Sequence, residues 1–186
     1  ILGRPGDNSV EMNSIAMEWG FDAELPHKVE MEARKIRQGG IGGKDFSGRR
    51  DFRKVLTFTI DPSDAKDFDD AISFRILLSE DLSPTPLHLR KNGEGRRGED
   101  NTEELYEIGI HIADVSYYVK TGSELDREAQ ERGTSVYLVD RTIPMLPEVL
   151  SNDLCSLVPH KDRLTMSAVF VIDKNAKIVN EWYGRT

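Results

Sequence analysis

The residues of this sequence that could do chemistry are concentrated in one short acidic run. Five of the 33 acidic residues fall within positions 61–70, at Asp61, Asp64, Asp67, Asp69 and Asp70. Two unit charges about 4 Å apart repel by roughly 4 kcal/mol at an effective dielectric constant near 20. If these carboxylates converge, they must share protons or bind cations. Oxygen ligands without His or Cys favour a hard ion such as Mg²⁺, Mn²⁺ or Ca²⁺.

A two-ion site for phosphoryl transfer is one use of such a run. It needs metals about 3.5–4 Å apart, bridged by carboxylates and a substrate phosphate. The opposing interpretation is a solvated acidic turn, since Asp favours loops and the segment 62–64 has turn chemistry. Spacing alone leaves both open, although the interleaved Phe68 and Ile72 favour a loop that packs on one side. The four residues with suitable spacing are Asp61, Asp67, Asp69 and Asp70.

Two other acidic sites do not match the sequence. An EF-hand starting at Asp61 would need Gly where Lys66 stands and Glu where Ile72 stands. A phosphatase with an aspartyl nucleophile needs an Asp-x-Asp pattern, which fails at Ser63. Both types of site are therefore rejected.

The elements around the acidic run predict a mixed α+β fold. The segment 55–60 is β-branched and apolar and is expected to be a buried strand, and 71–78 a second one, so that the run joins two strands. Residues 79–104 are rich in Pro, Gly and charge and are expected to form a surface insertion. Further strands are predicted at 106–115, 135–139, 165–173 and 177–183, and helices at 27–38, 124–132 and 149–157. Residues 1–20 are interpreted as the end of a β-rich module, and 21–50 as a helical linker.

Composition and charge limit the class of protein. The formal net charge of −8 argues against a nucleic-acid partner, unless the carboxylates are gathered around cations. The sequence contains no run of about 18 apolar residues, so it predicts no membrane span. The lone Cys155 has apolar neighbours and indicates a reducing compartment, which we expect to be the cytoplasm. The chain starts at Ile1 rather than Met, and we expect that it was cut from a longer protein.

Three stretches, in order, resemble the ribonuclease II and ribonuclease R (RNB) family. The first is TIDPSDAKDFDDA at 59–71, and the second is HIADVSYYV at 111–119. The third runs from TSVY at 134–137 through IPMLP at 143–147 to LSNDLCSL at 150–157. Within the family, ribonuclease R is the nearer match. The resemblance covers residues 50–186 well and 1–38 more loosely.

The resemblance implies the N-terminal portion of an RNB catalytic domain over residues 51–186, preceded at 1–20 by the tail of a cold-shock domain of OB type. It further implies processive hydrolysis of single-stranded RNA from the 3′ end, with release of nucleoside 5′-monophosphates and with Mg²⁺ or Mn²⁺ as cofactor. In the family this domain continues well past the position of Thr186. We therefore expect the isolated chain to bind metal weakly and to hydrolyse RNA poorly or not at all.

Site residues follow from the same resemblance. Asp61, Asp67, Asp69 and Asp70 match the family's acidic metal-site residues, and Asp69 is expected to be the catalytic carboxylate. Tyr137 matches the tyrosine that stacks on the terminal nucleotide, where an aromatic face holds any base by about 1–3 kcal/mol. Without the resemblance, Tyr137 would be interpreted as a core aromatic.

Other residues and other functions remain open. His111 is expected to pack or bond within its strand, and the basic cluster Arg49, Arg50, Arg53 and Lys54 is either a solvated face or a flank of the RNA path. One alternative function is a catalytically inactive relative that binds RNA or acts as a scaffold. Another is a Ca²⁺-binding domain without nuclease activity. Strands with unpaired edges also predict that the isolated chain self-associates.

Overall fold

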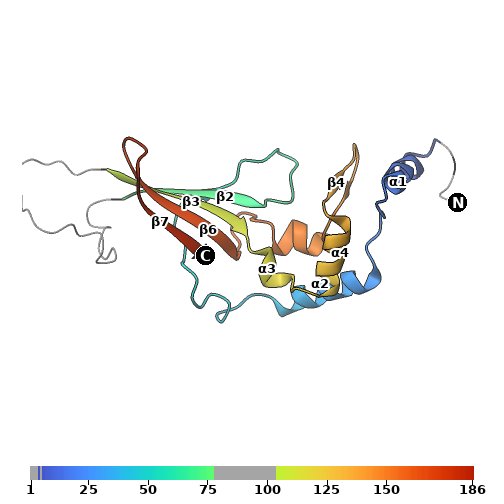
Figure 1. Ribbon diagram of the computed structural model, residues 1–186, viewed down its shortest axis with the longest axis horizontal. Helices are drawn as coiled ribbons and strands as arrows, with labels where there is room; N and C mark the ends of the chain where they lie inside the picture. Colours follow the sequence, from blue (N-terminus) through green and yellow to red (C-terminus); the bar gives the residue numbers. More distant parts are fainter. Residues whose placement is uncertain (1–3, 5, 78–103) are drawn as a thin grey trace, which may run out of the picture.

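The structure is a computed structural model that describes residue 4, residues 6–77 and residues 104–186. A twisted antiparallel sheet forms one end of the molecule, and a group of short helices forms the other (Figure 1). The order of the strands across the sheet is β1-β2-β3-β6-β7. They span Thr57–Phe58 (β1), Asp70–Leu77 (β2), Leu105–Ala113 (β3), Thr165–Asp173 (β6) and Ile178–Arg185 (β7).

The helical end carries the main apolar core. Its elements are α2 (His27–Gly39), α3 (Val115–Tyr118), α4 (Glu124–Arg132) and a π-helical turn, η2 (Leu150–Leu154). Buried Val29 and Ala33 from α2 belong to one cluster with Leu125 from α4, Leu150 from η2 and Leu164, which precedes β6. Cys155 belongs to the same cluster, and burial raises the pKa of its thiol to about 12. This core fixes the segments that carry residues 114–164 against the end of the sheet.

The two faces of the sheet differ in polarity. On one face His111 is buried, and its ring nitrogens bond the Ser167 hydroxyl at 2.7 Å and the Ser73 hydroxyl at 2.8 Å. Burial lowers the pKa of the His111 imidazole. His111 is therefore packed in the interior as expected, but its hydrogen bonds go to the neighbouring strands β2 and β6 and not to its own strand. The opposite face is apolar and partly open to solvent, at Phe74, Ile76, Ile110, Ile112 and Met166.

Most of the predicted elements are present. Strands β2, β3, β6 and β7 and helices α2 and α4 lie where the sequence predicts them. Helix α4 has the expected ends: the Ser123 hydroxyl accepts a hydrogen bond from the Asp126 amide, and Gly133 is left-handed with φ of 71°. Among the described residues, no helix is long and apolar enough to cross a membrane.

Four local predictions need correction. Residues 1–20 are not β-rich, because α1 occupies Asn8–Glu18; their assignment to a cold-shock domain stays a prediction. The buried strand at 55–60 is only the two-residue edge strand β1, with Leu56 69% and Ile60 81% exposed. The strand at 135–139 shrinks to β4 (Val136–Tyr137), which pairs with β5 (Thr142–Ile143). The helix at 149–157 is the shorter η2. Of the predicted insertion at 79–104, all but residue 104 lies outside the described residues.

Candidate active site

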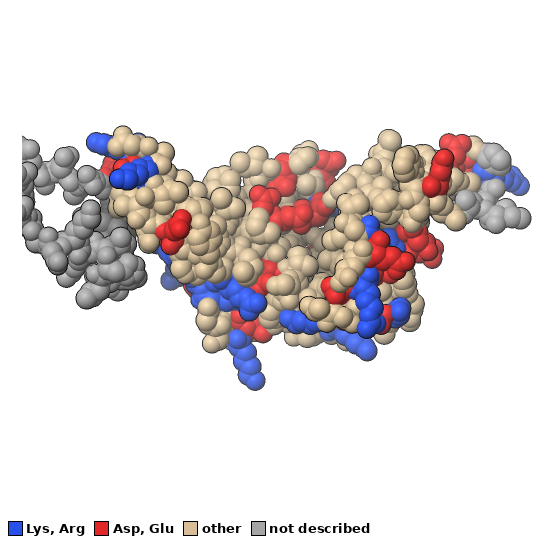
Figure 2. All heavy atoms as spheres, in the orientation of Figure 1, with Lys and Arg blue, Asp and Glu red and all other residues tan. Residues whose placement is uncertain are grey.

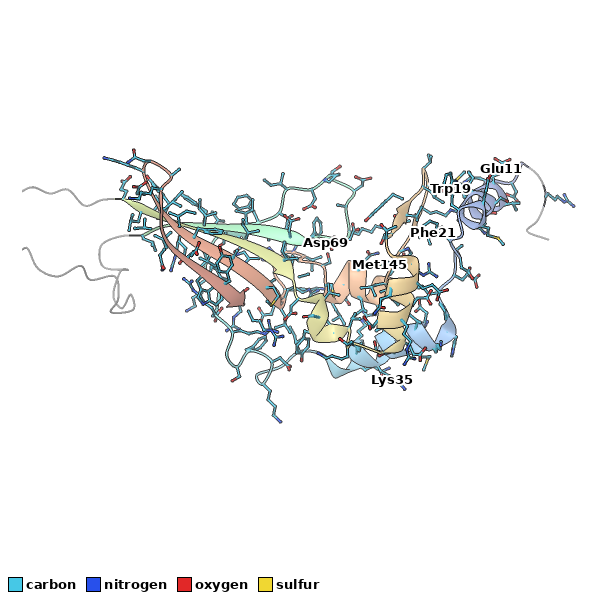
Figure 3. All side chains as sticks on the ribbon, in the orientation of Figure 1. Glu11, Trp19, Phe21, Lys35, Asp69 and Met145 are labelled. Carbon is cyan, nitrogen blue, oxygen red and sulfur yellow. The ribbon has the colours of Figure 1, made fainter. Side chains whose placement is uncertain are left out.

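The acidic loop, residues 61–70, leaves the edge strand β1 and returns into the sheet at Asp70, the first residue of β2. It rises beside the hairpin of β4 and β5, and Asp69 lies between the start of β2 and that hairpin (Figures 1 and 3). Asp61, Asp69 and Asp70 are exposed, whereas Asp67 and Phe68 are half-buried. The interleaving of apolar and acidic residues thus does produce a loop that packs on one side.

Hydrogen bonds to the backbone hold the C-terminal half of the acidic loop. The Ala113 amide at the end of β3 donates to the Asp69 carbonyl at 2.9 Å. The Leu157 amide donates to the Phe68 carbonyl at 2.8 Å. The loop is therefore fixed by two segments that follow it by more than 40 residues in the sequence.

The carboxylates of the loop share one electrostatic neighbourhood. The pKa of Asp69 is raised, first by its partial burial and then by the negative charges of Asp67, Asp70 and Asp61, in that order. Asp64, exposed in the same loop, is not among the groups that raise it. Acidic side chains gather on the surface between the sheet and the β4 hairpin (Figure 2). The four aspartates selected from the sequence are thus the ones that interact.

Tyr137 adds an aromatic ring to this neighbourhood. Its hydroxyl donates a hydrogen bond of 3.0 Å to Asp67 Oδ2, across 70 positions of sequence. This bond is the largest cause of the raised pKa of Tyr137. The residue is 68% exposed, so the interpretation as a core aromatic is wrong. An exposed ring beside the carboxylates is free to stack on a planar ligand.

The donor set fits a hard divalent cation in its chemistry. Its four carboxylates supply oxygen only, and a cation would relieve the repulsion that raises the pKa of Asp69. Among the described residues, however, no three His, Cys, Asp or Glu side chains lie close enough together to hold a metal ion. The four carboxylates therefore lie near one another but too far apart to coordinate one metal ion together. Mutual repulsion opposes their closer approach.

The three arginines of the basic cluster next to β1 form ion pairs. Arg49 Nη2 lies 2.7 Å from Asp114 Oδ2, with the two side chains 6% and 0% exposed. Arg50 pairs with buried Glu107 at 2.5 Å, and the exposed Arg53 pairs with Asp51 at 2.6 Å. These arginines line a cavity of about 740 Å³ on the polar face of the sheet, and no residue of the acidic loop lines it. Arg49 and Arg50 are therefore not a simple solvated face, whereas Arg53 and Lys54 are exposed, and a role of the cluster beside the RNA path stays a prediction.

Ser156 is a site residue that sequence reasoning missed. Its buried hydroxyl bonds the backbone of the acidic loop at Lys66 and Phe68. The residue belongs to the stretch 150–157, whose sequence resembles the family but assigns no role to Ser156. A separation of 90 residues from Lys66 leaves no local signal for this contact.

Comparison with known proteins gives this domain a family. The family model described as the RNB domain matches residues 49–186, and the chain belongs to the RNB family. Within that family, the chain is 44% identical over 181 residues to Ribonuclease R of Thermotoga maritima. The match covers 96% of this chain and 22% of that protein. The chain thus spans less than a quarter of the length of that relative.

Two solved structures share the fold. The RNase R of Mycoplasma genitalium, in complex with ribose methylated single-stranded RNA, matches with a TM-score of 0.77 and 28% identity, over 99% of this chain and 25% of that one. Yeast Ssd1, described as a pseudonuclease, matches with a TM-score of 0.66 and 22% identity, over 100% of this chain and 20% of that one. At that identity the second likeness concerns the fold alone.

Proposed function

We propose that the protein carrying this chain is a processive 3′-to-5′ exoribonuclease that hydrolyses single-stranded RNA to nucleoside 5′-monophosphates. The observation that carries this proposal is the cluster of Asp61, Asp67, Asp69 and Asp70, with Tyr137 bonded to Asp67, inside an RNB domain. The names of the relatives, which are ribonucleases, support it.

Each residue of the cluster has a proposed task. Asp61, Asp67, Asp69 and Asp70 would hold Mg²⁺ or Mn²⁺, which when bound supplies Lewis-acid polarisation and charge neutralisation at a scissile phosphate. Asp69 is the proposed catalytic carboxylate, because it is the member of the cluster whose pKa is raised by the charges of the other three. The exposed ring of Tyr137 would stack on the terminal base. An exposed aromatic face accepts any base, which suits degradation without sequence preference.

The isolated chain is expected to do less than the longer protein. It spans 22% of the Thermotoga maritima relative and holds its carboxylates without a ready ligand shell. We therefore propose that it binds divalent cations weakly and hydrolyses RNA poorly or not at all. A cytoplasmic location, expected from the lone Cys155, stays a prediction.

The direct test is degradation of RNA by the full-length protein. A 5′-labelled single strand is incubated with wild-type protein, Asp69→Asn and the matched control Asp64→Asn, in Mg²⁺ and in chelator. Wild type and Asp64→Asn should shorten the strand from its 3′ end and release 5′-monophosphates in Mg²⁺ alone. Asp69→Asn should be slower by about a hundredfold or more, because metal catalysis contributes several kcal/mol and about 1.4 kcal/mol is a factor of ten. Wild-type protein that binds RNA without shortening it would instead identify an inactive relative.

A further inference from the structure

Ser156 lies outside the acidic loop and is bonded to it at two points. The Ser156 hydroxyl accepts a hydrogen bond from the Phe68 amide at 3.0 Å. The same hydroxyl donates to the Lys66 carbonyl at 2.7 Å. These two backbone groups stand on either side of Asp67, so one side chain fixes the chain immediately before and after that carboxylate.

The position of these bonds matters because the acidic loop has few other backbone partners. Residues 61–69 precede β2 and are not paired in the sheet ladder, apart from the bond between the Ala113 amide and the Asp69 carbonyl. Backbone polar groups without a partner are costly in a half-buried segment. The Ser156 hydroxyl provides a hydrogen-bond partner for the Lys66 carbonyl and the Phe68 amide. The neighbouring Leu157 amide provides one for the Phe68 carbonyl.

Ser156 is itself rigidly placed. It is fully buried, and its amide donates to the Asp153 carbonyl at 3.1 Å. Arg163 Nε donates to the Ser156 carbonyl at 2.8 Å, and Arg163 Nη2 donates to Asp153 Oδ1 at 3.1 Å. The segment next to η2 is therefore a fixed platform, and the loop carrying the carboxylates rests against it.

We propose that Ser156 is a positioning residue for the acidic site, whose hydroxyl sets where Asp67 and Asp69 stand relative to each other. The proposal rests on the function proposed above, since it assigns Ser156 a part in the same site. Its role resembles that of the outer partners that orient metal ligands, whose loss typically costs about 10–100-fold in metal affinity or activity.

The test compares Ser156→Ala with Ser156→Thr, which keeps the hydroxyl, and with a matched control in the full-length protein. The control is Ser73→Ala, because Ser73 is also buried and bonded through its hydroxyl, but to His111 instead of the loop. The measurements are the dissociation constant for Mn²⁺ by calorimetry, kcat and KM for RNA degradation, RNA affinity in chelator, and thermal stability.

Ser156→Ala should weaken Mn²⁺ binding and lower kcat by about tenfold or more, while RNA affinity in chelator stays near that of wild type. Ser156→Thr should recover most of both losses, and Ser73→Ala should lose thermal stability alone. Ser156→Ala that behaves like Ser73→Ala would overturn the proposal. If the wild-type protein binds Mn²⁺ but does not degrade RNA, the proposed function is refuted. The Mn²⁺ dissociation constants of wild type and Ser156→Ala then test the positioning role of Ser156 by themselves. Wild-type protein that binds no Mn²⁺ would overturn both.

Discussion

Replacing Asp69 by asparagine removes one negative charge from a group of four, and in the absence of metal this should stabilise the fold. The pKa of Asp69 is raised by partial burial and by the charges of Asp67, Asp70 and Asp61, so the ionised carboxylate is held in an unfavourable place. Asparagine has nearly the same shape and no charge. The substitution that is proposed to abolish activity is therefore expected to increase the free energy of unfolding.

The size of this effect follows from the three interactions. A pair of solvent-exposed charges contributes about 0.2–1 kcal/mol, and solvent screens all three pairs because Asp69 is exposed. Their sum, taken near the lower end, is about 1 kcal/mol. For a chain of this size, about 1 kcal/mol corresponds to a rise in Tm of roughly 2–4 °C.

Thermal unfolding in chelator at low ionic strength measures this directly. Asp64→Asn is the matched control, since it removes a charge from the same loop but keeps Asp61, Asp67 and Asp70, whose charges act on Asp69. Asp69→Asn should melt above wild type, and Asp64→Asn should melt close to it. In the full-length protein, saturating Mn²⁺ should reverse the order of wild type and Asp69→Asn, because wild type and Asp64→Asn keep all four proposed ligands and gain stability from binding.

The pH dependence has a definite sign. Because the folded-state pKa of Asp69 is raised above 3.8, its ordinary value in an unfolded chain, the folded protein binds more protons than the unfolded chain between these two pKa values. The stabilising effect of protonation is fully present below 3.8 and is lost as the pH rises through the raised pKa. The advantage of Asp69→Asn over wild type should therefore vanish in acid and reach its full size near neutral pH. Asp69→Asn that melts at or below wild type in chelator at pH 7 would refute the electrostatic reasoning.

Three further predictions concern Tyr137, Arg49 and the open face of the sheet. Tyr137→Phe keeps the stacking ring and loses the bond to Asp67, so its RNA affinity in chelator should stay near wild type, whereas Tyr137→Ala should lose about 1–3 kcal/mol by fluorescence anisotropy; equal losses in both variants would contradict the stacking role. Arg49→Met leaves the buried Asp114 with only the more distant Arg185, at 3.7 Å, and should cost up to about 3–5 kcal/mol in urea unfolding, against less than about 1 kcal/mol for the exposed Arg53→Met. The isolated chain should elute above its monomer mass at high concentration, and Ile110→Lys on the apolar face should return it toward a monomer; a wild-type monomer at every concentration would argue against self-association.

The elements that could be predicted are those with strong local signals. Strands β3 and β6 are rich in β-branched residues, and α4 is bounded by a capping Ser123 and a left-handed Gly133. The segment 55–60 has an equally strong apolar pattern, yet only Thr57–Phe58 pairs, because it lies at the edge of the sheet beside β2. Local sequence carries no information on which strand becomes an edge. For α1 the interpretation of residues 1–20 as the end of a β-rich module is wrong, because Asn8–Glu18 is helical.

The candidate site divides in the same way. The acidic run and the spacing of its four aspartates are visible in the sequence, whereas their roles and that of Tyr137 follow from the resemblance to the RNB family. The bond between Tyr137 and Asp67, the Ser156 contacts and the buried pair of Arg49 with Asp114 all join residues at least 65 positions apart. Such contacts depend on how the helical end packs against the sheet. No pattern of spacing predicts them.

The central claim is that the carboxylates of the acidic loop bind a divalent cation together. Crystals of the full-length protein grown with Mn²⁺ and measured at the manganese absorption edge would locate the ion by its anomalous signal. An anomalous peak in contact with carboxylates from the set Asp61, Asp67, Asp69 and Asp70, absent in Asp69→Asn, is the predicted result. Ordered side chains at the acidic loop with no peak among them, at a Mn²⁺ concentration that supports RNA degradation, would contradict it.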